Sequence, residues 1–222
     1  MQEHKALPRG FTLVELLVAI AILALLAVVS WRGLDGMVRS QTQTGERTDA
    51  LLTLQTVLDQ WGTDLDALEP LPGTTALAWD GQVLRLTRRS ARADDAGAIV
   101  VAWARRNVDG TDQWLRWQSP PVATREQWRQ AWEGAAQWAR SPDAAARQRE
   151  TVLLPLADWQ LFFYREGAWA NALSSGATNT PTTANTSVPE GVRLVLTLPD
   201  GGAYAGVITR DWVSPLVGGN KS

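Results

Sequence analysis

The sequence contains no cysteine, and its only histidine is His4. Without cysteine, the chain can form no disulfide, no thiolate nucleophile and no cysteine-ligated metal site. His4 lies before the long apolar run, so the chain beyond residue 10 has neither cysteine nor histidine. This excludes ordinary zinc sites and Ser-His-Asp or Cys-His catalysis from that part. An enzyme built only from carboxylates, lysine and arginine remains conceivable, but we expect no catalytic residue, no metal and no cofactor.

An excess of positive charge is also lacking. The formal net charge is −2, and because the first ten residues carry +1, the rest of the chain carries −3. Nucleic-acid-binding proteins normally present a basic face, so we expect no nucleic-acid partner. The pairs Arg88-Arg89 and Arg105-Arg106 are short, and we interpret them as solvated strand ends.

A long apolar run stands near the start of the chain. Residues 16–29 are fourteen consecutive apolar residues, and the wider segment 11–31 has only Thr12, Glu15 and Ser30 as polar residues. As a helix this segment is about 30 Å long, which is about the thickness of a bilayer core. The sequence therefore predicts a membrane-spanning helix over residues 11–31.

The flanks of this run predict its orientation. Lys5 and Arg9 precede it, and Trp31 and Arg32 follow it, so we expect a cytoplasmic N-terminus and an exported C-terminal part. Three alternatives remain: a cleaved secretory signal, a plain signal anchor and a buried core helix. Residues 28–31 fit a signal cleavage site poorly, and the length and flanks oppose a core helix.

Glu15 is the feature that separates these alternatives. A carboxylate near the start of a membrane-spanning run costs about 2–3 kcal/mol on insertion scales, less near the interface. A residue with that cost indicates a function, and it requires a cationic partner.

The residues around Glu15 resemble a known motif. Residues 10–15 read GFTLVE, which is similar to the prepilin motif of type IV pilins and type II secretion pseudopilins. The resemblance implies that a prepilin peptidase cleaves between Gly10 and Phe11 and methylates the new amine of Phe11. It also implies that Glu15 meets the amine of Phe11 on a neighbouring subunit, so that each charge has a partner in the assembled filament.

Further segments resemble one class within this family. Residues 31–65 (WRGLDGMVRSQTQTGERTDALLTLQTVLDQWGTDL) are similar to the start of minor pseudopilins of the J class, and residues 189–194 (PEGVRL) resemble that class more loosely. Departures from other classes agree: cysteine is absent, Arg32 stands where type IV pilins usually have proline, and residues 199–222 lack the calcium-binding loop of the major pseudopilin. The K class typically lacks the glutamate that is present here as Glu15.

The J-class resemblance implies a non-catalytic assembly subunit. Its expected place is the tip complex of the type II secretion pseudopilus, beside the I, K and H types, where it helps to initiate the pseudopilus and export folded proteins. The expected location is the inner membrane, single-pass, with a periplasmic C-terminal domain and no small-molecule substrate. Two alternatives stay open: a minor type IV pilin for adhesion, motility or DNA uptake, and a membrane-anchored binding or enzymatic module.

The rest of the sequence predicts an α+β, pilin-like fold, in which a long N-terminal helix packs on antiparallel β-sheet. We divide the chain into a leader (1–10), a membrane and assembly helix (11–31), a neck with an amphipathic helix (32–69) and a β-rich periplasmic domain (70–222). An apolar stripe at helical spacing is expected to cover the domain's own sheet rather than a partner; it comprises Leu51, Leu54, Leu58, Trp61, Leu65 and Leu68.

Beyond Pro72 the pattern changes to strands. Segments with period-two alternation, separated by Gly and Asp turns, are expected to be strands: 76–79, 83–88, 99–104, 114–118, 151–154, 159–165, 192–198 and 204–210. A helix is expected near residues 125–139, and the polar segment 173–188 is expected to be a loop.

For two further features, we prefer a structural interpretation over a functional one. The 12 tryptophans are expected to fill a β core or an interface rather than to form a sugar or nucleic-acid platform. Asp109, Gly110 and Asp112 miss the spacing of a calcium loop and are expected to form a solvated turn.

Overall fold

The computed structural model describes residues 12–90, 97–174, 188–202 and 205–215. The chain divides into two compact units, Met1–Thr48 and Asp49–Ser222. The first helix, α1 (Leu13–Asp66), contributes to both units. We describe each unit by itself.

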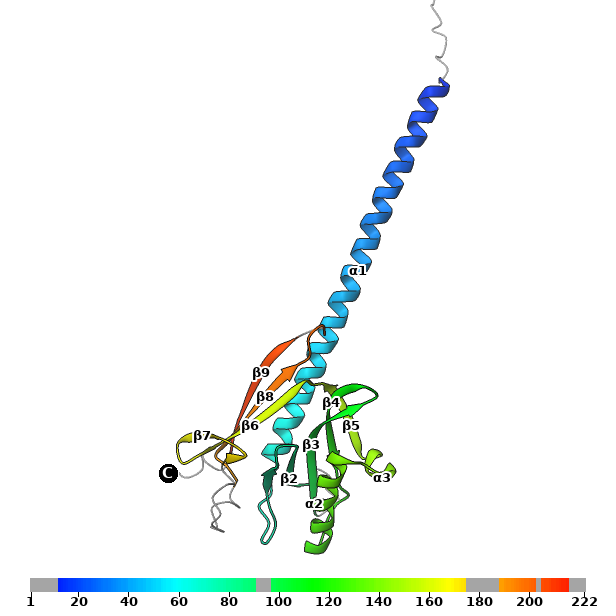
Figure 1. Ribbon diagram of the computed structural model, residues 1–222. Helices are drawn as coiled ribbons and strands as arrows, with labels where there is room; N and C mark the ends of the chain where they lie inside the picture. Colours follow the sequence, from blue (N-terminus) through cyan, green and yellow to red (C-terminus); the bar gives the residue numbers. More distant parts are fainter. Residues whose placement is uncertain (1–11, 91–96, 175–187, 203–204, 216–222) are drawn as a thin grey trace, which may run out of the picture. The chain divides into compact units, whose positions relative to one another are not determined.

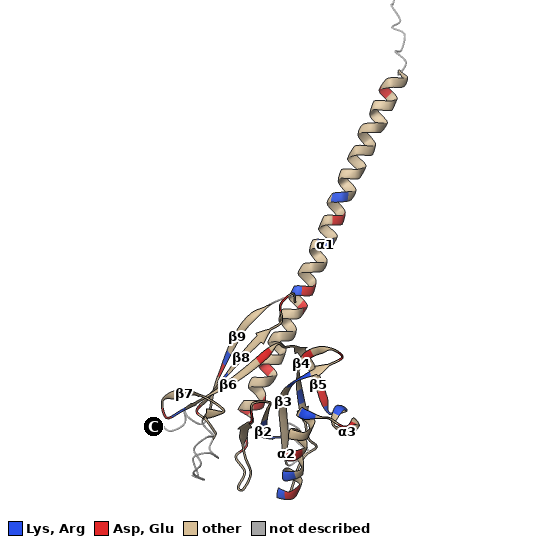
Figure 2. Cartoon of the chain, in the orientation of Figure 1, with Lys and Arg blue, Asp and Glu red and all other residues tan. Residues whose placement is uncertain are grey.

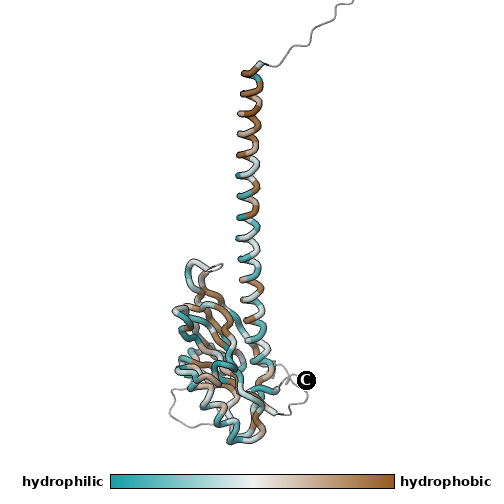
Figure 3. The backbone as a smooth tube through the Cα atoms, turned by 90° about the vertical axis from the view of Figure 1, so that its right-hand side faces the viewer, coloured by the Kyte–Doolittle hydropathy of each residue, from teal (hydrophilic) through white to brown (hydrophobic). Residues whose placement is uncertain are grey.

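The described part of the first unit is the N-terminal portion of α1, through Thr48. Its large apolar side chains, from Leu13 to Val38, are 52–76% exposed within the chain. They gather in the first half of the helix, which Figure 3 colours brown. Among the described residues, α1 is the one helix that is long and apolar enough to cross a membrane. The chain therefore fits a single-pass membrane anchor.

The second unit contains two antiparallel sheets (Figure 1). The strands of the first follow chain order: β1 (Leu77–Trp79), β2 (Val83–Arg89), β3 (Ala98–Val108), β4 (Thr111–Gln118) and β5 (Glu150–Pro155). The second sheet has the order β7-β6-β8-β9, with β6 (Asp158–Arg165), β7 (Ala168–Asn171), β8 (Gly191–Leu198) and β9 (Gly206–Val213). Helices α2 (Arg125–Arg140) and α3 (Ala144–Arg147) lie between β4 and β5 in the sequence.

Short turns fix the register of the first sheet. The β3–β4 hairpin turns at Asp109 and Gly110, whose φ angles are +50° and +85°. Tight two-residue hairpin loops need positive φ at both positions, which Asp-Gly tolerates well. The Asn107 side chain accepts a hydrogen bond from the Gly110 N–H (3.1 Å) and closes the turn.

The main core lies around the C-terminal part of α1. Residues 49–66 of α1 bury Leu54, Val57, Trp61 and Leu65 against inward-facing side chains of both sheets. The helical stripe predicted from the sequence is therefore confirmed as a core face for most of its length. Two residues of the stripe depart from the prediction. Leu51 is 55% exposed, and Leu58 is only partly buried.

A second, smaller core lies on the other side of the first sheet. There α2 packs Ala135 and Trp138 against Val100, Leu115 and Trp117. The Thr124 side chain caps the start of α2 in a reciprocal pair with Gln127, which satisfies backbone donors that a helix end leaves unpaired.

The tryptophans are mainly core residues, as the sequence analysis prefers. The side chains of Trp61, Trp103, Trp114 and Trp138 are at most 1% exposed. The rings of Trp103 and Trp114 lie 4.7 Å apart between centroids, within the range of favourable aromatic pairs.

The α+β class with a long helix packed on antiparallel sheet is confirmed. Each of the eight predicted strands overlaps an observed strand, and the helix near 125–139 is α2. The sequence analysis missed the four-residue elements β7 and α3. Tyr204 and most of the predicted loop at 173–188 lie outside the described residues.

Candidate assembly site

Glu15 lies in the first turn of α1, exposed and directly after Thr12 and two apolar residues. Its Oε2 accepts hydrogen bonds from the Thr12 N–H (3.2 Å) and the Thr12 hydroxyl (3.0 Å). In return, the Glu15 N–H donates to Thr12 Oγ1 (3.3 Å). This is a capping box, which satisfies backbone donors at the start of a helix.

The geometry leaves one side of this carboxylate open. Among the residues that the structure describes, both bonds accepted by Glu15 use Oε2. The opposite oxygen, Oε1, is therefore available to a donor outside this part of the chain. Negative charge is also favourable at this end of a helix, because the helix dipole is positive there.

No other charge lies near Glu15 along the helix. The next charged residue of α1 is Arg32, after sixteen uncharged positions, as the colours of Figure 2 show. Gly10 and Phe11, the predicted cleavage and methylation residues, lie outside the described residues. Their roles, and the pairing role of Glu15, therefore remain predictions.

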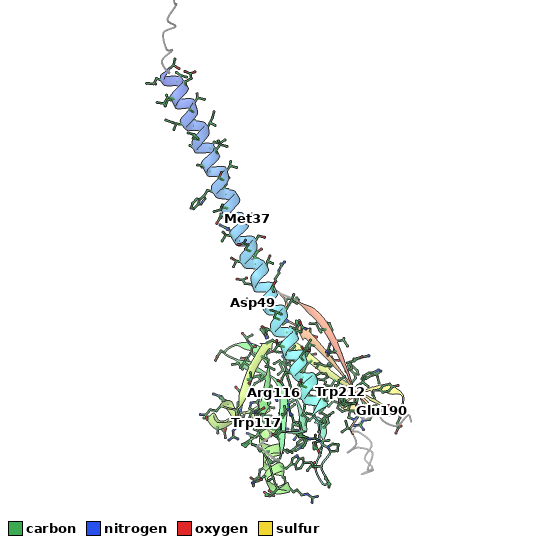
Figure 4. The ribbon with its side chains drawn as sticks, turned by 180° about the vertical axis from the view of Figure 1, so that it is seen from behind. Met37, Asp49, Arg116, Trp117, Glu190 and Trp212 are labelled. Carbon is green, nitrogen blue, oxygen red and sulfur yellow. The ribbon has the colours of Figure 1, made fainter. Side chains whose placement is uncertain are left out.

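Past Arg32, charged residues become frequent on α1. Asp35 and Arg39, one helical turn apart, form an exposed ion pair (2.8 Å). Met37 and Asp49, labelled in Figure 4, mark this stretch. The second compact unit begins at Asp49, within the segment 32–69 that the sequence analysis assigns to the neck and amphipathic helix.

At the other end of α1, Asp64 forms a buried charged centre. Its side chain is 0% exposed, a position at which a carboxylate without partners would be costly. Instead, five hydrogen bonds satisfy it, from Arg88 Nη1, Trp103 Nε1 (2.9 Å), Arg116 Nε (2.7 Å), Arg116 Nη2 (2.9 Å) and Gln60 Nε2 (3.1 Å).

Four of these five bonds come from three neighbouring strands. Arg88 is on β2, Trp103 on β3 and Arg116 on β4. One carboxylate of α1 therefore binds the middle of the first sheet. Two residues later, Asp66 accepts a hydrogen bond from Trp212 Nε1 (2.8 Å) on β9 of the second sheet. The last turn of α1 is thus held to both sheets, through Arg116 and Trp212 among others (Figure 4).

The sequence analysis did not find this centre. It interprets Arg88 as a solvated strand end, which is wrong, because Arg88 is 6% exposed and paired with Asp64. The same interpretation is wrong for Arg106, which is half-buried and makes two hydrogen bonds to Glu150 (2.9 and 2.7 Å). One feature of the sequence could have indicated that Asp64 is buried. It stands three residues after Trp61, so it lies on the apolar stripe.

The candidate calcium cluster is a turn. Asp112 pairs with Arg105 (2.6 Å) and accepts a hydrogen bond from Asn107 (3.1 Å), so its oxygens are already used. Among the described residues, no three metal-ligating side chains of the His, Cys, Asp and Glu types gather in one place.

A groove lies between α2, α3 and the segment after β4. Its lining includes Trp117, Pro121, Trp138 and one acid, Asp143. The Asp143 side chain already accepts the Ala146 N–H (2.7 Å) at the start of α3. A lone carboxylate that is used as a helix cap does not provide a pair of acid and base groups.

Comparison with known proteins identifies two kinds of likeness. Residues 7–31 match the family described as the prokaryotic N-terminal methylation motif. Over 210 residues the chain is 30% identical to "Type II secretion system protein J" of Vibrio cholerae serotype O1, covering 87% of this chain and 83% of that protein. It is 27% identical over 202 residues to the protein of the same name from Klebsiella pneumoniae, covering 85% and 88%.

Proposed function

Since this chain belongs to the family of type II secretion system protein J, we propose that it is a minor pseudopilin of the tip complex. In that role it joins the I, K and H types, helps to initiate the pseudopilus and so contributes to the export of folded proteins across the outer membrane. The observation that carries the proposal is an exposed carboxylate, Glu15, at the start of a helix that is long and apolar enough to cross a membrane and inside a methylation motif.

The chemistry of Glu15 explains why assembly is the proposed activity. Among the described residues of a single subunit, only Thr12 donates hydrogen bonds to the carboxylate, and a charge at the membrane is costly unless it is paired. Cleavage after Gly10 creates a cationic amine at Phe11. An amine from a neighbouring subunit that reaches Oε1 then neutralises both charges, so each subunit favours the addition of the next.

The proposed location follows from the same helix. Lys5 and Arg9 precede the apolar run, and basic residues favour the cytoplasmic side. We therefore place the leader in the cytoplasm, the helix in the inner membrane and the β-rich domain in the periplasm. The chain is a substrate of the prepilin peptidase and is itself no enzyme; pseudopilins are structural proteins.

Processing gives the first test. Protein purified from membranes of the native host is expected to begin at N-methyl-Phe11, because Gly10 and Phe11 match the peptidase site. Intact-mass and N-terminal peptide mass spectrometry measure this directly. A Gly10→Val variant, which places a branched side chain at the cleavage site, is expected to retain the leader. A wild-type chain that retains Met1, or that begins near Trp31, would contradict the proposal.

Partners and secretion give the second test. When the full-length chain is co-expressed with the I-, K- and H-type pseudopilins of its own system, we expect a defined complex that persists in moderate salt. The second unit exposes apolar side chains such as Val152, Trp169 and Val207 and carries little net charge, which favours apolar over long-range electrostatic contacts. Size-exclusion chromatography with light scattering measures the complex, and deletion of the gene is expected to abolish secretion. Binding to minor pilins of a type IV pilus instead, with normal secretion, would favour that alternative.

A further inference from the structure

The two sheets of the second unit end in four edge strands, β1, β5, β7 and β9. An edge strand exposes unpaired backbone groups, and proteins usually protect it by shortness, proline, charge or a bulge. Three of these edges have such protection. β1 has three residues and β7 has four, while β5 contains Pro155 and pairs with β4 through a register shift.

β9 is protected by neither shortness, proline nor a bulge. It has eight residues, contains no proline or lysine, and pairs with β8 in continuous register from Gly206 to Val213. Each of its two charged side chains has an oppositely charged partner within the unit, although the Arg210 side chain remains 54% exposed. Asp211 makes two hydrogen bonds with Arg193 (2.7 Å each), which lowers the pKa of Asp211, and Arg210 lies 3.9 Å from Asp59.

The direction of the β9 backbone groups follows from its register. Ser214 donates its N–H to the Glu190 carbonyl (2.8 Å), toward β8. On the other side of β8, the Thr197 carbonyl accepts the Ala157 N–H (2.9 Å), so Thr197 bonds toward β6. Because these directions alternate along antiparallel strands, the backbone groups of Val207, Thr209, Asp211 and Val213 point away from β8.

The side chains at the same positions share one face of the sheet. Trp212 is buried against the core and Ile208 packs on it, so the odd-numbered side chains of β9 lie on the opposite face. Val207 and Val213 are 66% and 70% exposed there. Within the part of the chain that the structure describes, the outer edge of β9 therefore combines backbone groups that have no hydrogen-bond partner with an apolar side chain at each end.

We propose that β9 is a strand-addition site, at which an extended segment of another pseudopilin extends the four-stranded sheet. The segment is about seven residues long. It hydrogen-bonds to the backbone at Val207, Thr209, Asp211 and Val213, and it places apolar side chains beside Val207 and Val213. Main-chain hydrogen bonds supply affinity in this mode of recognition, and alternate side chains supply specificity. This inference depends on the proposed function only for the identity of the partner.

A second copy of this chain fits the edge less well. In antiparallel self-pairing, outward-pointing residues must face outward-pointing residues. The register that sets Val207 against the second copy's Val213 also sets Arg210 directly against the second copy's Arg210. Like charges directly opposite each other destabilise a strand pair. A partner of different sequence avoids this repulsion.

The test compares two substitutions at the centre of the edge. Thr209→Pro removes the outward N–H, and edge strands tolerate proline when its nitrogen faces solvent. Thr209→Val keeps that N–H and is the matched control. The full-length chain is purified with the I-, K- and H-type pseudopilins, and residue-resolved hydrogen exchange is measured in the chain alone and in the mixture. Circular dichroism and thermal unfolding verify that both variants fold.

In the wild-type mixture, we expect exchange at Val207, Thr209, Asp211 and Val213 to slow by about tenfold or more, with little change at Ile208, Arg210 and Trp212. Thr209→Pro is expected to abolish this protection and to lower co-purification, while Thr209→Val retains both. Because an unfolded Thr209→Pro chain gives no information, Val207→Lys serves as the second variant with the same expectation.

The outcomes separate this inference from the proposed function. Co-purification without protection of these amides overturns the strand-addition site and leaves the proposed function intact. If the mixture shows neither co-purification nor protection, both the strand-addition site and the proposed function are overturned. Protection that appears in the chain alone and rises with its concentration indicates pairing with a second copy, and this also overturns the inference.

Discussion

Replacement of Asp64 by alanine is expected to lower the free energy of unfolding by about 3–5 kcal/mol. The substitution leaves the guanidinium groups of Arg88 and Arg116 in a buried site without their carboxylate. It also leaves Trp103 Nε1 without its acceptor. Removal of one partner from a buried charged group is far more costly than removal of an exposed ion pair, because the remaining charges stay desolvated.

The full-length chain in detergent allows this to be measured by urea unfolding, followed by tryptophan fluorescence. Asp66→Ala is the matched control: it lies two residues later, is exposed, and loses one hydrogen bond to Trp212, so about 1 kcal/mol is expected. Equal midpoints for Asp64→Ala and Asp66→Ala would show that the buried centre contributes no special stability.

Glu15→Val is expected to leave membrane insertion unchanged or improved and to disrupt assembly. Insertion improves because the substitution removes a charge from the apolar segment. Assembly suffers because a neighbour's amine at Phe11 loses its carboxylate. Truncation of one partner of a buried charge pair typically costs about 2 kcal/mol or more, so the co-purified pseudopilins are expected to fall by about thirtyfold, and secretion falls with them.

A second substitution separates pairing from helix capping. Glu15→Gln can accept the same hydrogen bonds from Thr12, because glutamine also serves in a capping box, but it carries no charge. If the negative charge is required, Glu15→Gln fails like Glu15→Val at equal expression. Normal secretion and co-purification by Glu15→Gln would assign Glu15 a capping role only, and the pairing role would be abandoned.

Local patterns account for the elements that the sequence analysis predicts. Asp-Gly pairs such as Asp109-Gly110 mark hairpins because few other residues adopt positive φ easily. The spacing from Leu54 to Leu65 indicates a helix with one buried face, and that face meets the core. Such signals depend on neighbours in the sequence, so they can be interpreted without the fold.

The features that were missed depend on distant residues. Arg88 and Arg116 are 24 and 52 positions from Asp64, and nothing near them in the sequence distinguishes a buried arginine from an exposed one. β7 is four residues long, too short for its alternation to be recognised. The order β7-β6-β8-β9 likewise depends on pairing across residues 172–190, which local patterns do not specify.

The bonds of Asp64 have a mechanical consequence for any force that acts along α1. A pull on α1 reaches the first sheet through one carboxylate that is bound to β2, β3 and β4 at once. The load is thereby divided among three strands, so the hydrogen bonds to all three strands resist the separation of α1 from the first sheet. The second sheet is connected to the same helix turn separately, through Asp66 and Trp212, so a force on the helix is transmitted to both sheets.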